Sequence, residues 1–169
     1  REEKLYTDSL YNSIIKTQFD LEQKAIQRII EWYNIDERVF YRKLANTGNV
    51  GDSRTILISA DDTDQKKIKV KQLTIDHKPE SNGEKARINA RGGRVAQAQD
   101  FRGRFSGPQR VWVKALNSPG LAMSRSIGDC VAHSVGCACE PDITHTTLMP
   151  NDKIVLLASD GIWEFLTNQ

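Results

Sequence analysis

The sequence predicts a mixed α/β fold, and three observations support this expectation. Apolar residues recur at helical spacing from about residue 8 to residue 33, which predicts one long amphipathic helix. Two short runs, Thr55 to Ser59 and Ile68 to Leu73, have the composition of strands. A continuous apolar run, Lys153 to Ala158, is of the kind that forms a strand buried on both faces. We therefore expect helices packed against β-structure.

The predicted N-terminal helix has Thr7 or Asp8 as its N-cap. We interpret it as a layer that covers the core rather than as a partner-binding helix, because no chemical cluster stands on its polar face. Its apolar positions are Leu10, Ile14, Leu21, Ala25, Ile29 and Tyr33.

The two strand-like runs are joined by turn-forming residues 61–65, which predicts a hairpin. A second helix is expected from Glu80 to Arg91, with Ser81 or Asn82 as its cap and Gly92-Gly93 at its end.

Glycine, proline and arginine punctuate the segment from Gly93 to Pro119, so we expect mostly loop there, with a short strand over 111–113. Two interpretations of its basic residues stay open. They form an ordinary solvated surface, or they contact phosphate. The arginines are Arg94, Arg102, Arg104 and Arg110.

Composition excludes several classes of protein. The 169 residues are 38% hydrophobic, which suits one globular domain, and 24 Lys+Arg against 22 Asp+Glu leave a formal charge of only +2. This balance argues against a nucleic-acid or membrane-surface partner.

No apolar run reaches membrane length and no apolar leader opens the sequence, so we expect an intracellular protein, cytoplasmic or nuclear. Cys130, Cys137 and Cys139 lack zinc-module spacing and are interpreted as reduced thiols.

Two carboxylates stand where a strand meets a turn. Asp160 directly follows the apolar run and precedes Gly161, while Asp52 lies just before the Thr55 strand, with Arg54 beside it. A rigidly placed carboxylate is what a hard cation such as Mg²⁺ or Mn²⁺ requires. Taken singly, Asp160-Gly161 is an ordinary turn and Asp52 with Arg54 an ordinary ion pair. We nevertheless expect Asp52 and Asp160 to be neighbours.

An ordered set of six motifs makes the stretch from about residue 46 to residue 169 resemble the type 2C family of metal-dependent serine/threonine protein phosphatases. The motifs are Asn49 to Arg54, Leu73 to Pro79, Glu84 to Arg87 with Gly92-Gly93, Gly120 to Asp129, Glu140 to Ile143, and Ala158 to Phe165.

The resemblance implies a four-layer α-β-β-α sandwich of two antiparallel sheets, here in part, with residues 1–45 as helix and connection and residues 46–169 carrying the motifs of one partial domain. It also implies hydrolysis of phosphoserine and phosphothreonine in protein substrates by a water that two divalent ions, Mg²⁺ or Mn²⁺, activate.

Residue roles follow from the same resemblance. Asp160 matches a metal-ligating Asp, and Asp52 matches an Asp that helps to hold an additional, weaker metal. Glu164 stands where many members have Asp, and the resemblance implies that it reaches the metal through a water, with Gly161 also lying around the metal site. Arg94, Arg102 and Arg104 fall in the substrate-facing flap. The positions that form the turns and loops of the motifs are Gly51, Ser53, Arg54, Ser124, Arg125, Gly128 and Asp129.

The family's early Asp-Gly-His-Gly motif has no counterpart, because Asp160-Gly161 is the only Asp-Gly pair in the sequence. The matching bridging Asp, general-acid His, phosphate-binding Arg and final Asp-Asn motif are absent too, and central strands expected between Tyr33 and Leu44 are missing. Either these residues are part of a longer protein, or the chain is a divergent remnant completed by a protein partner. We expect weak or no metal binding and no turnover from these residues alone.

Two functions therefore stay open. One is an active phosphatase of which this chain is an incomplete portion, and the other is a pseudophosphatase that serves as a binding or structural subunit. The presence of Asp52 and Asp160 favours the enzyme, on the argument that unpaired carboxylates at buried sites are costly to keep.

Overall fold

The computed structural model describes residues 8–9, 11–13, 44–61, 64 and 67–169. Residues 8–9 and 11–13 are helical, and the rest of the expected helix from residue 8 to residue 33 lies outside the described residues. Within the described part, no helix is both long and apolar enough to cross a membrane.

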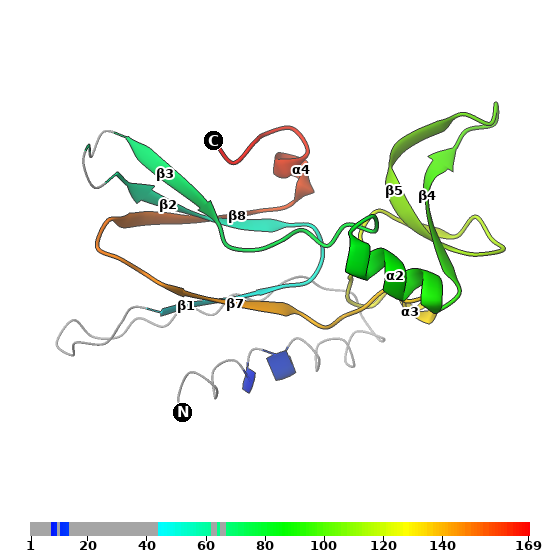
Figure 1. Ribbon diagram of the computed structural model, residues 1–169, viewed down its shortest axis with the longest axis horizontal. Helices are drawn as coiled ribbons and strands as arrows, with labels where there is room; N and C mark the ends of the chain where they lie inside the picture. The colour runs from blue at the N-terminus through cyan, green and yellow to red at the C-terminus, as the bar shows by residue number, and fades with distance from the viewer. Residues whose placement is uncertain (1–7, 10, 14–43, 62–63, 65–66) are drawn as a thin grey trace.

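Three small antiparallel sheets organise the described chain. One pairs β1 (Leu44–Asn49) with β7 (Asp142–Thr147), and the second has the order β3 (Ile68–Gln72), β2 (Arg54–Ala60), β8 (Asp152–Ala158). The third has the order β4 (Gly93–Gln99), β5 (Phe105–Val113), β6 (Pro119–Leu121). Figure 1 shows the β3-β2-β8 sheet lying over the β1-β7 pair, with the third sheet at the other end of the molecule beside α2 (Asn82–Ala90). The expected antiparallel sheets with helices are thus confirmed.

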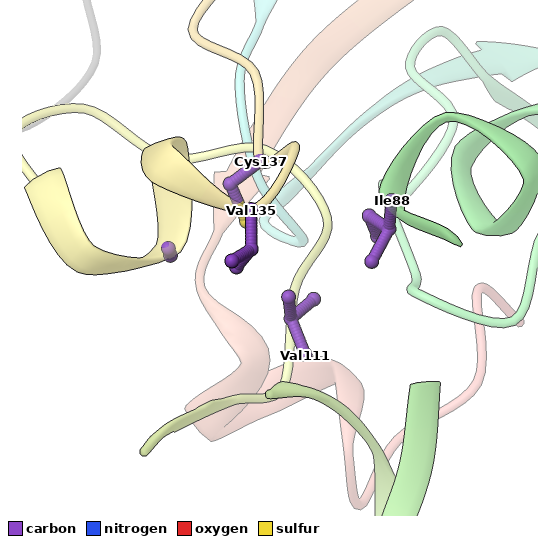
Figure 2. Packing of buried hydrophobic residues seen from close by; sticks show 5 residues of the cluster. Ile88, Val111, Val135 and Cys137 are labelled. Atoms are coloured by element: carbon purple, nitrogen blue, oxygen red, sulfur yellow. The ribbon is translucent and has the colours of Figure 1, made fainter. Parts of the chain in front are cut away.

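The cluster of buried hydrophobic residues in the described part of the chain lies in the region of α2 and the third sheet. Ile88 of α2 and Val111 of β5 are fully buried, and they cluster with Ala132, Val135 and Cys137 from α3 (Cys130–Ser134) and the loop after it. Figure 2 shows Ile88, Val111 and Val135 converging from three separate segments. A Cβ at Gly93 would lie 2.6 Å from both Ile88 Cγ2 and Val135 O, so only glycine lets β4 begin this close to α2.

The second helix and the β2-β3 hairpin lie where the sequence predicted them. Helix α2 begins after Ser81 and ends before Gly92, whose φ of 82° suits the turn that follows a helix.

Two expectations were wrong. The segment from Gly93 to Pro119 is not mostly loop, because β4 and β5 form a long hairpin in it. Its register shifts between Gln97 and Ala98, and this bulge accommodates Gly107 and Pro108 without breaking the hairpin.

Strand β8 is not buried on both faces. It is an edge strand of the described sheet, where Ile154 is 55% and Leu156 42% exposed. A run of this composition suits a central strand, but the described residues supply a neighbour on one side only.

Candidate metal-binding turns and the network that holds them

The turn between β1 and β2 holds one buried carboxylate. Gly51 has a φ of 104°, a left-handed conformation that favours glycine, and Asp52 after it is only 5% exposed. Lys78 Nζ lies 2.6 Å from Asp52 Oδ2. The alternative interpretation of Asp52 and Arg54 as an ion pair is therefore wrong. The premise that Asp52 is unpaired is wrong too, because an ammonium group already faces it.

The side chain of Arg54 points instead to the segment after β3 and to α4 (Asp160–Trp163) with the residues that follow it. Its guanidinium forms two hydrogen bonds with Asp76, at 3.0 and 2.8 Å, and a third with Asn168 Oδ1 at 2.6 Å. The bond to Asp76 raises the pKa of Arg54 further, so its charge is permanent. The same guanidinium lies 5.3 Å from the ring centre of Trp163. Arg54 thus ties the start of β2 to α4.

Trp163 completes this attachment from the other side. Its indole Nε1 donates to Ala158 O at 2.8 Å and to Arg54 O at 3.2 Å, the carbonyls of two residues that pair across β2 and β8. Helix α4 is therefore fixed at one end of this sheet, although it is short and largely exposed.

The sheet register brings the two candidate ligands to the same end of one sheet. Arg54 pairs with Ala158, so Asp52 precedes β2 and Asp160 follows β8 by the same two residues. Asp160 is exposed in the first turn of α4, next to Gly161, and Glu164 one turn later is also exposed. A carboxylate pair in this position suits a hard divalent cation in the type of its donors. Two carboxylates are too few ligands for such an ion. The described part of the chain brings together no group of three or more His, Cys, Asp or Glu side chains that could hold a metal ion.

The conformation of the Gly51-Asp52 turn depends on His77. The Gly51 N–H donates to His77 Nδ1 at 3.0 Å, and the His77 N–H donates back to Gly51 O at 3.0 Å. The other ring nitrogen, Nε2, donates to Asp142 Oδ2 at 3.0 Å, because Nδ1 is already an acceptor. Burial lowers the pKa of His77 despite the opposing bond to Asp142, so the ring is neutral at pH 7.

Asp142 is held in turn by Arg125. Arg125 Nη1 donates to Asp142 Oδ1 at 2.8 Å and to Glu140 O at 2.8 Å, while its Nη2 lies 3.0 Å from Glu84 Oε1. The pKa of Asp142 is lowered because hydrogen bonds from His77 and Arg125 outweigh the effect of burial. Glu140-Pro141-Asp142 is thereby joined to the other motifs.

Several hydrogen-bond donors of this network converge on the carboxylate of Glu84. The residue is 8% exposed. Its carboxylate accepts from both Nη atoms of the Arg87 guanidinium at 2.8 Å, from Arg125, and from Ser124 Oγ at 2.5 Å. Burial alone would raise the pKa of Glu84, but these hydrogen bonds hold it at about 2. An unbroken chain of polar contacts thus runs from α2 through Arg125, Asp142 and His77 to Gly51.

The remaining motif positions have local structural roles. Ser53 is buried beside Asp52, and the Asp129 side chain accepts from Ala132 N at 3.4 Å at the start of α3. Gly128 before it has a φ of 83°. The side chains of Ser124 and Arg125, in contrast, bond chiefly to carboxylates.

The candidate flap arginines are spread along the β4-β5 hairpin and its surroundings. Arg94 bonds to Asn117 Oδ1 at 3.0 Å and stacks on Trp112, and Arg104 bonds to Asp100 at 2.9 Å. Arg102 lies 5.2 Å from the ring centre of Phe101, which is 91% exposed at the tip. The hairpin therefore presents a basic and aromatic tip on a defined scaffold.

Sequence reasoning assigned no role to four residues that prove central: His77, Lys78, Glu84 and Asp142. All four stand inside the quoted motifs, and His77 and Glu84 are polar groups that the fold buries. Each of the four bonds to a residue that is 26 to 65 positions away in the sequence. The bonds join His77 to Gly51, Lys78 to Asp52, Glu84 to Arg125, and Asp142 to His77.

The comparisons with known proteins agree with this architecture. The family model described as protein phosphatase 2C matches residues 36–169. "Probable protein phosphatase 2C 18" of Arabidopsis thaliana is 44% identical over 124 residues, and "Probable protein phosphatase 2C 12" of Oryza sativa subsp. japonica is 41% identical over 121 residues; each alignment covers 72% of this chain. The chain spans 23% and 30% of the length of these two relatives.

Solved structures show the same fold. A serine-threonine phosphatase 2C from Toxoplasma gondii superposes with a TM-score of 0.63 at 23% identity, over 74% of this chain and 40% of that one. A sex-determining protein of C. elegans superposes with a TM-score of 0.58 at 25% identity, over 75% of this chain and 26% of that one. These two solved structures share the antiparallel α+β fold of this chain. The chain belongs to the protein phosphatase 2C family.

Proposed function

We propose that this chain supplies the central and late motifs of a metal-dependent serine/threonine protein phosphatase. The observation that carries the proposal is the register Arg54↔Ala158, which sets Asp52 and Asp160 at one end of the same sheet. The family is metal-dependent in general, and Asp52 and Asp160 are the residues of this chain that would hold Mg²⁺ or Mn²⁺, with Glu164 in reach through a water. Bound ions would supply an activated water and charge neutralisation at phosphorus.

This chain's own residues would contribute placement. Arg54 and Trp163 fix α4, which carries Asp160, and His77 and Lys78 fix the turn that carries Asp52. The substrate class is a phosphoserine or phosphothreonine protein, and the tip of the β4-β5 hairpin with Arg102 is the surface that would meet it. A location in the cytoplasm or nucleus remains part of the proposal.

The test is phosphate release from a phosphothreonine peptide in the presence of Mn²⁺. It compares the 169-residue chain, the protein translated from the full open reading frame that encodes these residues, and a chimera. In the chimera, this chain's matching segment replaces its counterpart in the 44%-identical Arabidopsis relative. We expect turnover near background from the 169 residues alone and turnover from the other two.

Within the chimera, Asp160→Asn should abolish turnover and Asp52→Asn should reduce it, while Glu80→Gln, which changes an exposed carboxylate just before α2, should leave it unchanged. Turnover that survives Asp160→Asn would show that the site lies elsewhere.

A second candidate function is a pseudophosphatase that acts as a structural or binding subunit. One observation favours it: Lys78 already balances the charge of Asp52, so this buried carboxylate is stable without a metal. Within the described residues β8 lies at the edge of its sheet, and this position supports a partner that adds a strand to the sheet. A folded chimera with no turnover would favour this candidate.

A further inference from the structure

His77 forms hydrogen bonds with both the N–H and the carbonyl group of Gly51. The Gly51 N–H donates to the His77 ring and the Gly51 carbonyl accepts from the His77 backbone, each at 3.0 Å, and Asn49 Nδ2 reaches the same carbonyl at 3.1 Å. His77 is 3% exposed, so water cannot readily replace the ring as the acceptor. The left-handed conformation of Gly51, which aims the next residue, therefore depends on His77 Nδ1 being an acceptor.

The proton of the His77 ring is placed by a residue on another strand. Arg125 can only donate, so Asp142 must present an oxygen to it, and the second oxygen of Asp142 faces His77 Nε2. Nε2 must then carry the ring proton, which leaves Nδ1 free to accept from Gly51. The charged groups that face the ring are Asp142, Arg125 and, beyond it, Glu84.

His77 and its neighbour Lys78 hold the turn at two different points. Lys78 binds the Asp52 carboxylate itself at 2.6 Å, and His77 binds the backbone one residue earlier. A cation that binds Asp52 must compete with the Lys78 ammonium for the same oxygen. When that contact is lost, the backbone contact with His77 is what still aims the carboxylate.

From this geometry we infer that His77 is a positioning residue for Asp52: its Nδ1 atom, kept unprotonated by Asp142 and Arg125, fixes the Gly51 turn so that the Asp52 carboxylate is pre-organised for a divalent cation. The inference rests on the proposed function only in taking Asp52 as a ligand. It assigns to the buried network of Arg125, Asp142 and His77 the task of presenting that ligand.

Two substitutions of His77 separate positioning from general packing. In His77→Asn, the amide oxygen stands close to the position of Nδ1 and keeps an acceptor for the Gly51 N–H. In His77→Gln, the amide stands close to the position of Nε2, so the contact with Asp142 is kept and the Gly51 N–H loses its acceptor. Both variants remove the ring, so both disturb packing by a similar amount.

A third variant leaves His77 in place. In Asp142→Asn, the side-chain oxygen must face Arg125, so the NH₂ group faces His77 Nε2. The ring is then driven to the other tautomer, in which Nδ1 carries the proton and opposes the Gly51 N–H. This variant should behave like His77→Gln.

The readouts are ¹⁵N NMR of the 169-residue chain and a titration with Mn²⁺ that follows line broadening around Asp52. In the wild-type chain, we expect the Nε2–H tautomer and a scalar coupling across the hydrogen bond from Gly51 N to His77 Nδ1. One buried hydrogen bond corresponds to a change of about three- to tenfold. We therefore expect His77→Gln and Asp142→Asn to weaken the Mn²⁺ effect about three- to tenfold relative to His77→Asn, while the urea midpoints of the two His77 variants stay alike.

The inference is overturned if His77→Asn and His77→Gln weaken Mn²⁺ binding equally, or if Nδ1 carries the proton in the wild-type chain. Failure of the proposed function looks different. An inactive chimera that shows the expected Mn²⁺ ranking would remove the phosphatase activity and leave the role of His77 intact.

Discussion

Replacing Glu84, the one carboxylate of α2, by glutamine should destabilise the protein. The substitution keeps the size of the side chain but removes the negative charge that two guanidinium groups and the Ser124 hydroxyl share. It also turns an NH₂ group toward Arg87 or Arg125, which offer only donors.

The magnitude follows from the pKa. A carboxyl group whose pKa falls from 4.5 to about 2 on folding contributes up to about 3 kcal/mol at neutral pH. Solvent reaches part of the cluster and screens it, so we expect the loss to be about 2 kcal/mol. For a urea slope of about 2 kcal/mol per molar, this corresponds to a midpoint lower by about 1 M.

Urea unfolding followed by circular dichroism measures this loss, with Glu80→Gln as the control because Glu80 is exposed. The control should change stability by less than about 0.5 kcal/mol. The sign of the pH dependence is fixed as well: Glu84 has a depressed pKa, so its contribution is complete above pH 4.5 and is lost as the pH falls toward 2. A urea midpoint of Glu84→Gln equal to that of the wild type would refute this account of the cluster. So would a loss of stability toward acid pH that is as large in Glu84→Gln as in the wild type.

Three further predictions concern other parts of the network. Burial lowers the pKa of His77 from 6.5, so the contribution of His77 to wild-type stability should be complete above pH 6.5 and should fall as the pH drops below that value. The urea midpoint, measured as a function of pH, should decrease in this range for the wild type, and His77→Asn should lack this part of the decrease. Trp163→Phe removes hydrogen bonds to Arg54 O and Ala158 O and should cost about 1–2 kcal/mol by urea unfolding, whereas Phe165→Leu at a 78% exposed position should cost little; equal effects would contradict the anchoring role of Trp163. Amide hydrogen exchange should be slow at Val111, which is paired on both sides, and fast at Gly103 in the hairpin tip; fast exchange at both would exclude the hairpin.

The sequence was informative where local chemistry decides structure. The Gly51-Asp52 turn, the helix that ends at Gly92 and the β2-β3 hairpin each depend on residues close together in the chain, so their positions could be predicted. The antiparallel sheets followed from the resemblance that six ordered motifs carry.

The rest depends on distant partners. Lys78 rather than Arg54 reaches Asp52, and nothing in the spacing of these residues distinguishes the two. The β4-β5 hairpin was mistaken for loop because Gly107 and Pro108 usually end a strand, whereas here a bulge accommodates them. The charge network could not be predicted either, because Gly51, His77, Glu84, Arg125 and Asp142 meet only after the chain has folded.

The edge position of β8 in the described sheet bears on how this polypeptide behaves in concentrated solution. Its exposed Ile154, Leu156 and Leu157 lie on a strand that has a described neighbour on one side only, and such a strand is a template on which a further chain can add. Self-association should therefore grow with concentration and compete with any ligand that approaches the end of the sheet. The substitution Leu156→Lys would place a positive charge on that strand. It should oppose edge-to-edge pairing, because like charges would approach one another when the β8 strands of two copies pair.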